Sequence, residues 1–141
     1  WGLSANVWSC PSFNELTRDG QNVDRFNLLH PLETPKLPFV TEQLQPFDGP
    51  VVASTDYMKA YAEQIRPFIP KGRSYKVLGT DGFGRSDSRA KLREFFEVDR
   101  RFVTLAALKA LADAGELEVS VVSKAMKEFG ISADKVNPAR A

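Results

Sequence analysis

The residues best suited to chemistry lie in one glycine-rich stretch, GTDGFGRSDS, at positions 79–88. It follows the apolar run YKVL and precedes the helical pattern SRAKLREFF. The stretch matches G-x-x-x-x-G-[basic]-S, the spacing of a loop whose backbone amides and lysine bind phosphate. Arg85, however, stands where such a loop has lysine, and Asp81 places a carboxylate inside it.

Three interpretations of this loop remain open. A phosphate or nucleotide site over residues 79–86 is disfavoured, because the planar arginine fork does not replace a compact ammonium. Loops at the carboxyl ends of parallel strands also face ligands and partner surfaces. On that basis, Asp81, Phe83, Arg85 and Asp87 are candidates for an interface. In the third interpretation, the aspartates neutralise Arg85 and cap the next helix, which is a purely structural role.

Length and composition limit the class of protein. With 141 residues and 43% hydrophobic content, the chain is expected to bury a core and to form one domain, residues 1–141. A net charge of +1 without a dense basic segment argues against nucleic acid as a partner. Apolar runs fall far short of the roughly 20 residues that cross a bilayer, and no leader pattern is present. We therefore expect a soluble cytoplasmic protein with no membrane partner.

Two residue types occur once each and restrict the possible sites. Cys10 alone cannot form an internal disulfide or a zinc site built on cysteine pairs. His30 alone rules out histidine-rich metal sites and lies in a proline-flanked segment, where an ordinary loop role is expected. His30 is therefore only a secondary candidate for an interface.

The hydrophobic pattern alternates between strands and helices. Strands are expected at residues 5–10, 50–55 and 74–79. A first helix is expected to begin at Pro11 and Ser12 and to stop at Gly20. Proline-rich residues 27–50 predict an irregular segment with one short helix around TEQL. This order predicts an α/β fold with a parallel sheet.

The helix expected after the second strand has its own pattern. Thr55 or Asp56 is the expected cap, and Pro67 is expected to end the regular helix. The residues that recur at helical spacing in this segment are Tyr57, Ala60, Tyr61, Gln64, Ile65 and Phe68.

After the glycine loop, the chain is expected to be helical to its end. One helix buries Leu92, Phe95 and Phe96, and a long helix follows from Asp99 with Gly115 as its stop. A last helix ends at Gly130. The expected core residues of the last two helices are Phe102, Leu105, Leu108, Leu111, Ala112, Val119, Val122, Met126 and Phe129.

Several segments of the sequence resemble one known family. SFNELTRDG, NLLHP, VVASTDYMKAYAEQIRPFIP and YKVLGTDGFGRSDSRAKLREFFEVD are similar to the C-terminal domain of homodimeric bacterial pyruvate dehydrogenase first components. The similarity continues through ADKVNP and so covers essentially the whole chain. It implies a three-layer, transketolase C-terminal-like α/β domain with a small sheet of about five strands. The first strand and helix of such a domain are expected to be missing here, which would make the chain a fragment of a larger subunit.

The resemblance also implies a chemistry that these residues do not carry. The intact subunit is expected to decarboxylate pyruvate on thiamine diphosphate and magnesium, and then to acetylate a lipoyl group reductively. Those cofactors are expected on other domains, so no catalytic, cofactor-binding or metal-binding residue is assigned to this chain. Its expected partners are the remaining domains of the subunit, the dimer mate and the lipoyl arm of the acetyltransferase. A free-standing nucleotide-binding domain and a module that docks the acetyltransferase are the alternatives.

Overall fold

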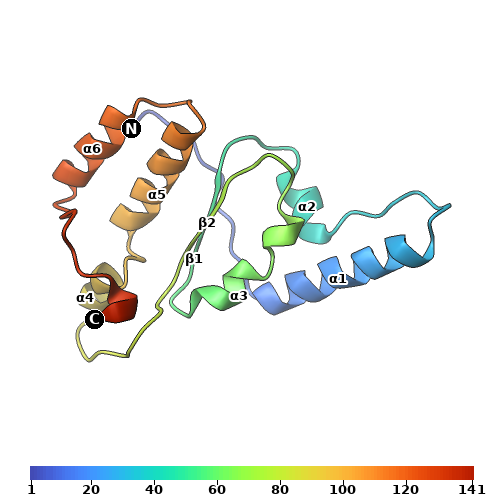
Figure 1. Ribbon diagram of the computed structural model, residues 1–141, viewed down its shortest axis with the longest axis horizontal. Coiled ribbons are helices and arrows are strands. Elements are labelled where there is room, and N and C mark those ends of the chain that lie inside the picture. Colours follow the sequence, from blue (N-terminus) through green and yellow to red (C-terminus); the bar gives the residue numbers. More distant parts are fainter.

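The computed structural model describes all residues 1–141 as an elongated α/β arrangement with a two-stranded sheet at its centre (Figure 1). The elements are α1 (Phe13–Leu29), α2 (Phe39–Leu44), β1 (Val51–Ser54), α3 (Lys59–Glu63), β2 (Tyr75–Leu78), α4 (Arg89–Phe95), α5 (Arg100–Asp113) and α6 (Val119–Glu128), with 3-10 helices at Arg66–Phe68 and Pro138–Arg140. No helix is both long enough and apolar enough to cross a membrane.

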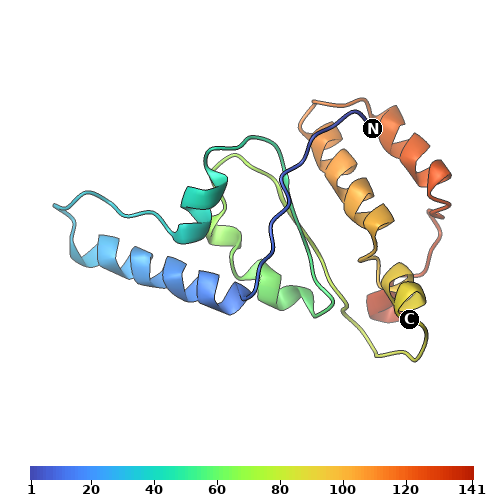
Figure 2. The ribbon, with the colours of Figure 1, turned by 180° about the vertical axis from the view of Figure 1, so that it is seen from behind.

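The sheet consists of β1 and β2, which run parallel in the register Val51 to Tyr75 and Ser54 to Leu78. It lies between α1, α2 and α3 on one side and α5 and α6 on the other (Figures 1 and 2). The predicted α/β class and both of these strands are confirmed. The sheet contains two strands rather than the roughly five that the family resemblance implied, so each strand has one unpaired edge.

The strand expected at residues 5–10 is wrong. This segment runs extended across the strands (Figure 2), but no backbone hydrogen bond involves residues 1–11. A strand forms only where a neighbouring backbone supplies donors and acceptors. Here only side chains hold the segment, with Trp1 edge-on to Phe129 and Trp8 edge-on to Phe47, both at 6.0 Å between ring centroids.

Helix α1 begins as expected but does not stop at Gly20. Ser12 caps it by accepting a hydrogen bond from the Glu15 backbone N–H at 3.2 Å, and the helix continues to Leu29. Gly20 is buried inside the helix, where a Cβ would lie 2.4 Å from the Phe68 ring. The glycine therefore allows a close approach between α1 and the Arg66–Phe68 turn.

Helix α3 is shorter than expected and presents a different face. It ends at Glu63, and a 3-10 turn carries the chain through Pro67. Ala62, Ile65 and Phe68 are buried, whereas Tyr57, Ala60, Tyr61 and Gln64, which belong to the predicted helical pattern, are exposed. The apolar spacing was read correctly as helical, but part of that apolar face has no neighbour within this chain.

The C-terminal helices follow the predicted order. Asp99 caps α5 by accepting from the backbone N–H groups of Arg101 and Phe102, and Ala114 and Gly115 follow its end. Helix α6 packs antiparallel to α5 (Figure 1) and ends before Gly130 as expected. Two expectations fail, because Val119 is exposed and residues 130–137 are not helical.

The core is smaller than the composition led us to expect, since only 16 of 141 residues are buried. One cluster joins α2, the Arg66–Phe68 turn and β2, and a second joins α5 and α6. The members of the first are Val40, Leu44, Ile65, Phe68 and Tyr75, and those of the second are Leu108, Val122 and Ala125. Large apolar side chains are therefore exposed around both clusters.

Candidate functional site

The glycine loop leaves the carboxyl end of β2 and closes on the start of α3. The Thr80 backbone N–H donates to the Tyr57 carbonyl at 2.9 Å, and the Thr80 hydroxyl donates to the Asp56 carbonyl at 3.2 Å. The loop is thus fixed to the turn after β1, as expected for loops at the carboxyl ends of adjacent parallel strands.

Asp81 has a structural task in this loop. Its Oδ1 accepts a hydrogen bond from the Lys59 backbone N–H at 3.0 Å, and its Oδ2 lies 3.9 Å from the Lys59 ammonium. Lys59 is the first residue of α3, whose N-cap residue Met58 makes no side-chain cap. The expected caps Thr55 and Asp56 are therefore wrong, and the cap comes from a residue distant in sequence.

Asp56 instead binds the helix that follows the loop. Its carboxylate accepts from Arg93 Nε at 3.0 Å and from Arg93 Nη2 at 2.7 Å, with Arg89 Nη2 at 3.5 Å. The hydrogen bonds from Arg93 lower the pKa of Asp56, and the charges of Arg93 and Arg89 act in the same direction. The segment ASTDYMK is thus tied to α4.

The middle of the loop contacts the C-terminal tail. Gly82 has φ +106°, and a Cβ there would lie 2.5 Å from the Pro138 carbonyl oxygen. A residue with a side chain would be strained in both respects. Beyond Gly82, Phe83 projects into solvent with 84% of its surface exposed.

Arg85 and Asp87 do not neutralise each other. The Arg85 guanidinium lies over the Phe95 ring, 4.1 Å from its centroid, and forms no ion pair within the chain. Asp87 Oδ1 accepts from the neighbouring Ser88 N–H at 2.6 Å, and Ser88 rather than an aspartate caps α4. The structural interpretation is therefore wrong in both parts, since no aspartate pairs with Arg85 and Asp81 caps α3, the helix before the loop, instead of α4.

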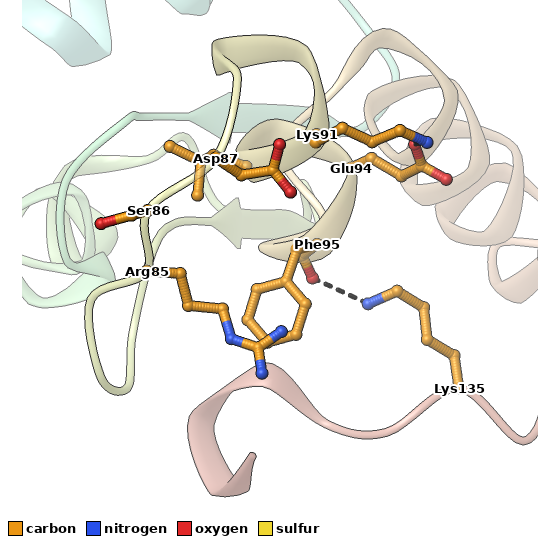
Figure 3. A pocket seen from close by; sticks show the side chains of 8 residues that line it. Arg85, Ser86, Asp87, Lys91, Glu94, Phe95 and Lys135 are labelled. Atoms are coloured by element: carbon orange, nitrogen blue, oxygen red, sulfur yellow. Dashed lines mark hydrogen bonds and ion pairs between the residues drawn. The ribbon is translucent and has the colours of Figure 1, made fainter.

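An open pocket of about 470 Å³ lies between the end of the loop, α4 and the C-terminal tail (Figure 3). Lys135 closes one side of the pocket. Its ammonium donates to the Phe95 carbonyl at 2.7 Å and to a Glu97 carboxylate oxygen at 3.0 Å. The lining residues are Arg85, Ser86, Asp87, Lys91, Leu92, Glu94, Phe95 and Lys135. Sequence reasoning missed Lys135, because nothing in its local pattern places it beside α4.

His30 is the C-cap residue of α1, and this end of α1 lies far from the loop that follows β2 (Figures 1 and 2). Its exposed ring stacks on Phe26 with 4.2 Å between centroids, and Nδ1 lies 2.9 Å from the Phe26 carbonyl oxygen. The structure therefore does not bring His30 together with the glycine-loop candidates.

The loop geometry does not support a phosphate site. The Asp81 carboxylate adds a negative charge to the loop and is held by the Lys59 backbone N–H. The helix after the loop has only 7 residues, and its first turn is already capped by Ser88. Arg85 reaches away toward Phe95 rather than back over the loop amides.

The fold and loop define an α/β domain whose candidate surface lies at the carboxyl ends of two parallel strands. The chain belongs to the transketolase-like TK C-terminal domain family, whose sequence profile matches residues 1–99. This match confirms the family predicted from the sequence of the glycine loop and the segments before it.

Curated relatives carry one name. Over 138 residues, the chain is 62% identical to the pyruvate dehydrogenase E1 component of Pseudomonas aeruginosa, 59% to that of Cupriavidus necator and 54% to that of Escherichia coli K12. These matches cover 98% of the chain but only 15–16% of each relative's length. The relatives are oxidoreductases, and this chain corresponds to one domain of such an enzyme.

Proposed function

We propose that this chain is a non-catalytic C-terminal domain of a pyruvate dehydrogenase subunit, and that it packs against the subunit's other domains and its dimer mate. The observation that carries this proposal is the small buried core, 16 of 141 residues, beside many large exposed apolar side chains. An independent domain of this length normally buries much more of its surface. Its apolar faces therefore suit contact with further protein.

The exposed face of α3 is the part of this surface best suited to a protein contact. Tyr57, Met58 and Tyr61 are 59%, 45% and 38% exposed, and the two tyrosine rings lie 5.1 Å apart. Tyrosine and methionine are enriched at the centres of protein interfaces. A groove of about 530 Å³ between α1 and α3, lined in part by Met58 and Tyr61, continues this face.

The unpaired backbone supports the same proposal. Both outer edges of the two-stranded sheet lack a neighbouring strand, and residues 5–10 run extended without backbone partners. Exposed sheet edges promote pairing with another chain unless they are covered. We propose that further polypeptide of the subunit covers them.

Catalysis is proposed to reside on other domains. Thiamine diphosphate bound through magnesium would supply the chemistry of pyruvate decarboxylation and reductive acetylation of lipoyl groups. Magnesium at a diphosphate needs carboxylate and carbonyl oxygens at one point. In this chain no three His, Cys, Asp or Glu side chains converge, so its residues do not fit that group. We derive no catalytic step from them.

The glycine loop is proposed to contribute to the surface around the entrance for the lipoyl arm of the acetyltransferase. Phe83 and Arg85 are the residues free to do so, because Asp81 is held by α3. We place the subunit in the cytoplasm, as a homodimer. Direct docking of the acetyltransferase by this domain is the second candidate, and the exposed Phe83 is the feature that favours it.

Complementation tests the proposal. The intact subunit is truncated to remove these 141 residues, and the chain is then added back as a separate polypeptide. We expect the two pieces to form a complex on a sizing column and the complex to regain pyruvate decarboxylation. Full activity of the truncated subunit without the chain would contradict the proposal. Binding of the chain to the acetyltransferase alone would favour the second candidate.

A further inference from the structure

The Arg85 guanidinium lies against an aromatic ring and has no polar partner within the chain. It lies 4.1 Å from the centre of the Phe95 ring, at the mouth of the pocket between the loop, α4 and the C-terminal tail (Figure 3). Stacking on an aromatic face orients the planar fork and leaves its N–H donors available. Arginine held in this way is ready to bind a carboxylate in the plane of the fork.

This state distinguishes Arg85 from the other arginines. Arg66, Arg89, Arg93 and Arg101 all form ion pairs. The side chains of Arg25, Arg100 and Arg140, like that of Arg85, have no hydrogen bond or ion pair within the chain, but no aromatic ring holds their guanidinium groups. Arg85 alone combines unused donors, an aromatic ring against its guanidinium and a pocket.

The charges around the pocket define the group that would fit. Lys135 is paired with Glu97 at 3.0 Å and Lys91 with Glu94 at 3.3 Å, so both are largely neutralised. The charged groups of the pocket that have no polar partner are the Arg85 guanidinium and Asp87 Oδ2, because Asp87 Oδ1 accepts from the Ser88 backbone N–H. A matching group therefore presents a carboxylate to Arg85 and a hydrogen-bond donor to Asp87.

A polypeptide segment with an acidic side chain presents that combination. The side-chain carboxylate would face Arg85, a backbone N–H would face Asp87, and the aliphatic stem would lie against Leu92 and Phe95. A phosphate group has the wrong character, because its second negative charge would face the Asp87 carboxylate, which has no cation to balance it.

We infer that this pocket is the docking site for an acidic segment of the same subunit, from the polypeptide outside residues 1–141. The inference rests on the proposed function. The relatives indicate the source, since the chain spans only 15–16% of their length and most of the polypeptide lies outside it. Arg85 is then a specificity residue of the domain contact.

The test uses the intact subunit with the substitution R85K, which keeps the charge and places a primary amine where the fork was. A carbodiimide joins an amine to a carboxylate in direct contact, and peptide mass spectrometry identifies the joined residues. We expect position 85 to be joined to an Asp or Glu outside residues 1–141 of the same polypeptide. Mixed dimers of isotopically heavy and light subunits distinguish this product from one between two copies.

The matched control is R25K, because Arg25 is also unpaired and exposed but is not stacked on a ring. We expect no such product from position 25. The inference is overturned if position 85 gives no product, if it is joined only to a carboxylate within residues 1–141, or if the joined acid belongs to the dimer mate or the acetyltransferase.

A second measurement uses R85Q, which removes the charge. Loss of a charge-assisted hydrogen bond is expected to raise the rate of protease cleavage at the junction before the domain about tenfold, with R25Q unchanged. An equal rate for both variants would overturn the inference. Equal cleavage rates would overturn only the docking of the acidic segment. The proposed function itself would be contradicted by a different result, full activity of the truncated subunit without the chain.

Discussion

The Asp81 carboxylate accepts a hydrogen bond from the Lys59 backbone N–H at 3.0 Å, across 22 positions of sequence. This contact makes the loop after β2 the cap of helix α3. Because the exposed Tyr57 and Met58 lie just before α3 and Tyr61 lies on it, the cap also sets the position of the proposed interface. A residue of the glycine loop thus acts on a surface formed by another element.

Replacing Asp81 tests this cap. D81A is expected to destabilise the chain by about 1 kcal/mol, because the Lys59 backbone N–H at the start of α3 loses its acceptor. D81N keeps an oxygen acceptor and is expected to cost clearly less. Urea denaturation of both variants measures the difference. Equal stability of D81A and the unmodified chain would remove Asp81 from this role.

Gly20 provides a test in which two effects oppose each other. Alanine has the higher helix propensity by about 1 kcal/mol, but its Cβ would lie 2.4 Å from the Phe68 ring. We expect G20A to destabilise the chain by about 1–3 kcal/mol, because overpacking outweighs propensity. The double variant G20A/F68L should recover part of this loss. A stabilising effect of G20A would refute the close packing of α1 on this turn.

The Asp56 interaction with Arg93 makes stability depend on pH. The pKa of Asp56 is lowered below its ordinary value of 3.8 in the folded chain, so the folded state resists protonation of this carboxyl more than the unfolded state does. The contribution is complete above that ordinary value and is lost as the pH falls through the lowered pKa. Because both side chains are substantially exposed, it should stay below about 1 kcal/mol.

Urea titrations from neutral to acidic pH compare the chain with D56N. The stability difference should be largest at neutral pH and should vanish in acid, with R93Q reproducing the behaviour. A difference that grows as the pH falls would have the wrong sign for this account.

The buried Tyr75 hydroxyl provides a test of the core. It donates to the Ala62 carbonyl at 2.7 Å, and burial raises its pKa. Y75F is expected to cost about 1–2 kcal/mol, because the carbonyl loses a partner in a buried place. Y57F is the matched control, since the exposed Tyr57 hydroxyl makes no hydrogen bond within the chain. Equal effects of the two variants would contradict this assignment.

The exposed loop tip should matter for docking rather than for folding. Phe83 has 84% of its surface exposed and Arg85 is held only by Phe95, so F83A/R85A should leave the helix content unchanged. In the intact subunit the same pair is expected to weaken the domain contact about tenfold or more. Circular dichroism and size-exclusion analysis separate the two effects. Loss of helix signal would show that the loop is structural.

Local patterns were sufficient to predict most elements of the fold. The apolar runs around Val51 and Tyr75 predicted the two parallel strands, and Gly115 and Gly130 marked the ends of α5 and α6. The end of the first helix was predicted wrongly at Gly20. Glycine occurs both where helices end and where a helix packs closely against another segment, and here it serves the second purpose. The segment at residues 5–10 misled because strand propensity does not supply a pairing partner.

Contacts between distant residues could not be derived in the same way. Asp81 caps a helix 22 positions earlier, Asp56 pairs with Arg93 37 positions later, and Lys135 binds the Phe95 carbonyl 40 positions earlier. Spacing within one element carries no signal for such pairs. The sequence of the glycine loop was nevertheless enough to predict the family, and the match over residues 1–99 confirms that prediction.

Calorimetry with thiamine diphosphate and magnesium shows whether these residues can hold the cofactor. The 141-residue chain and the intact subunit are titrated side by side under the same conditions. We expect saturable heat with the intact subunit and none with the chain. Micromolar binding by the chain alone would contradict this expectation, because the cofactor would then be held by residues assigned here only to domain contacts.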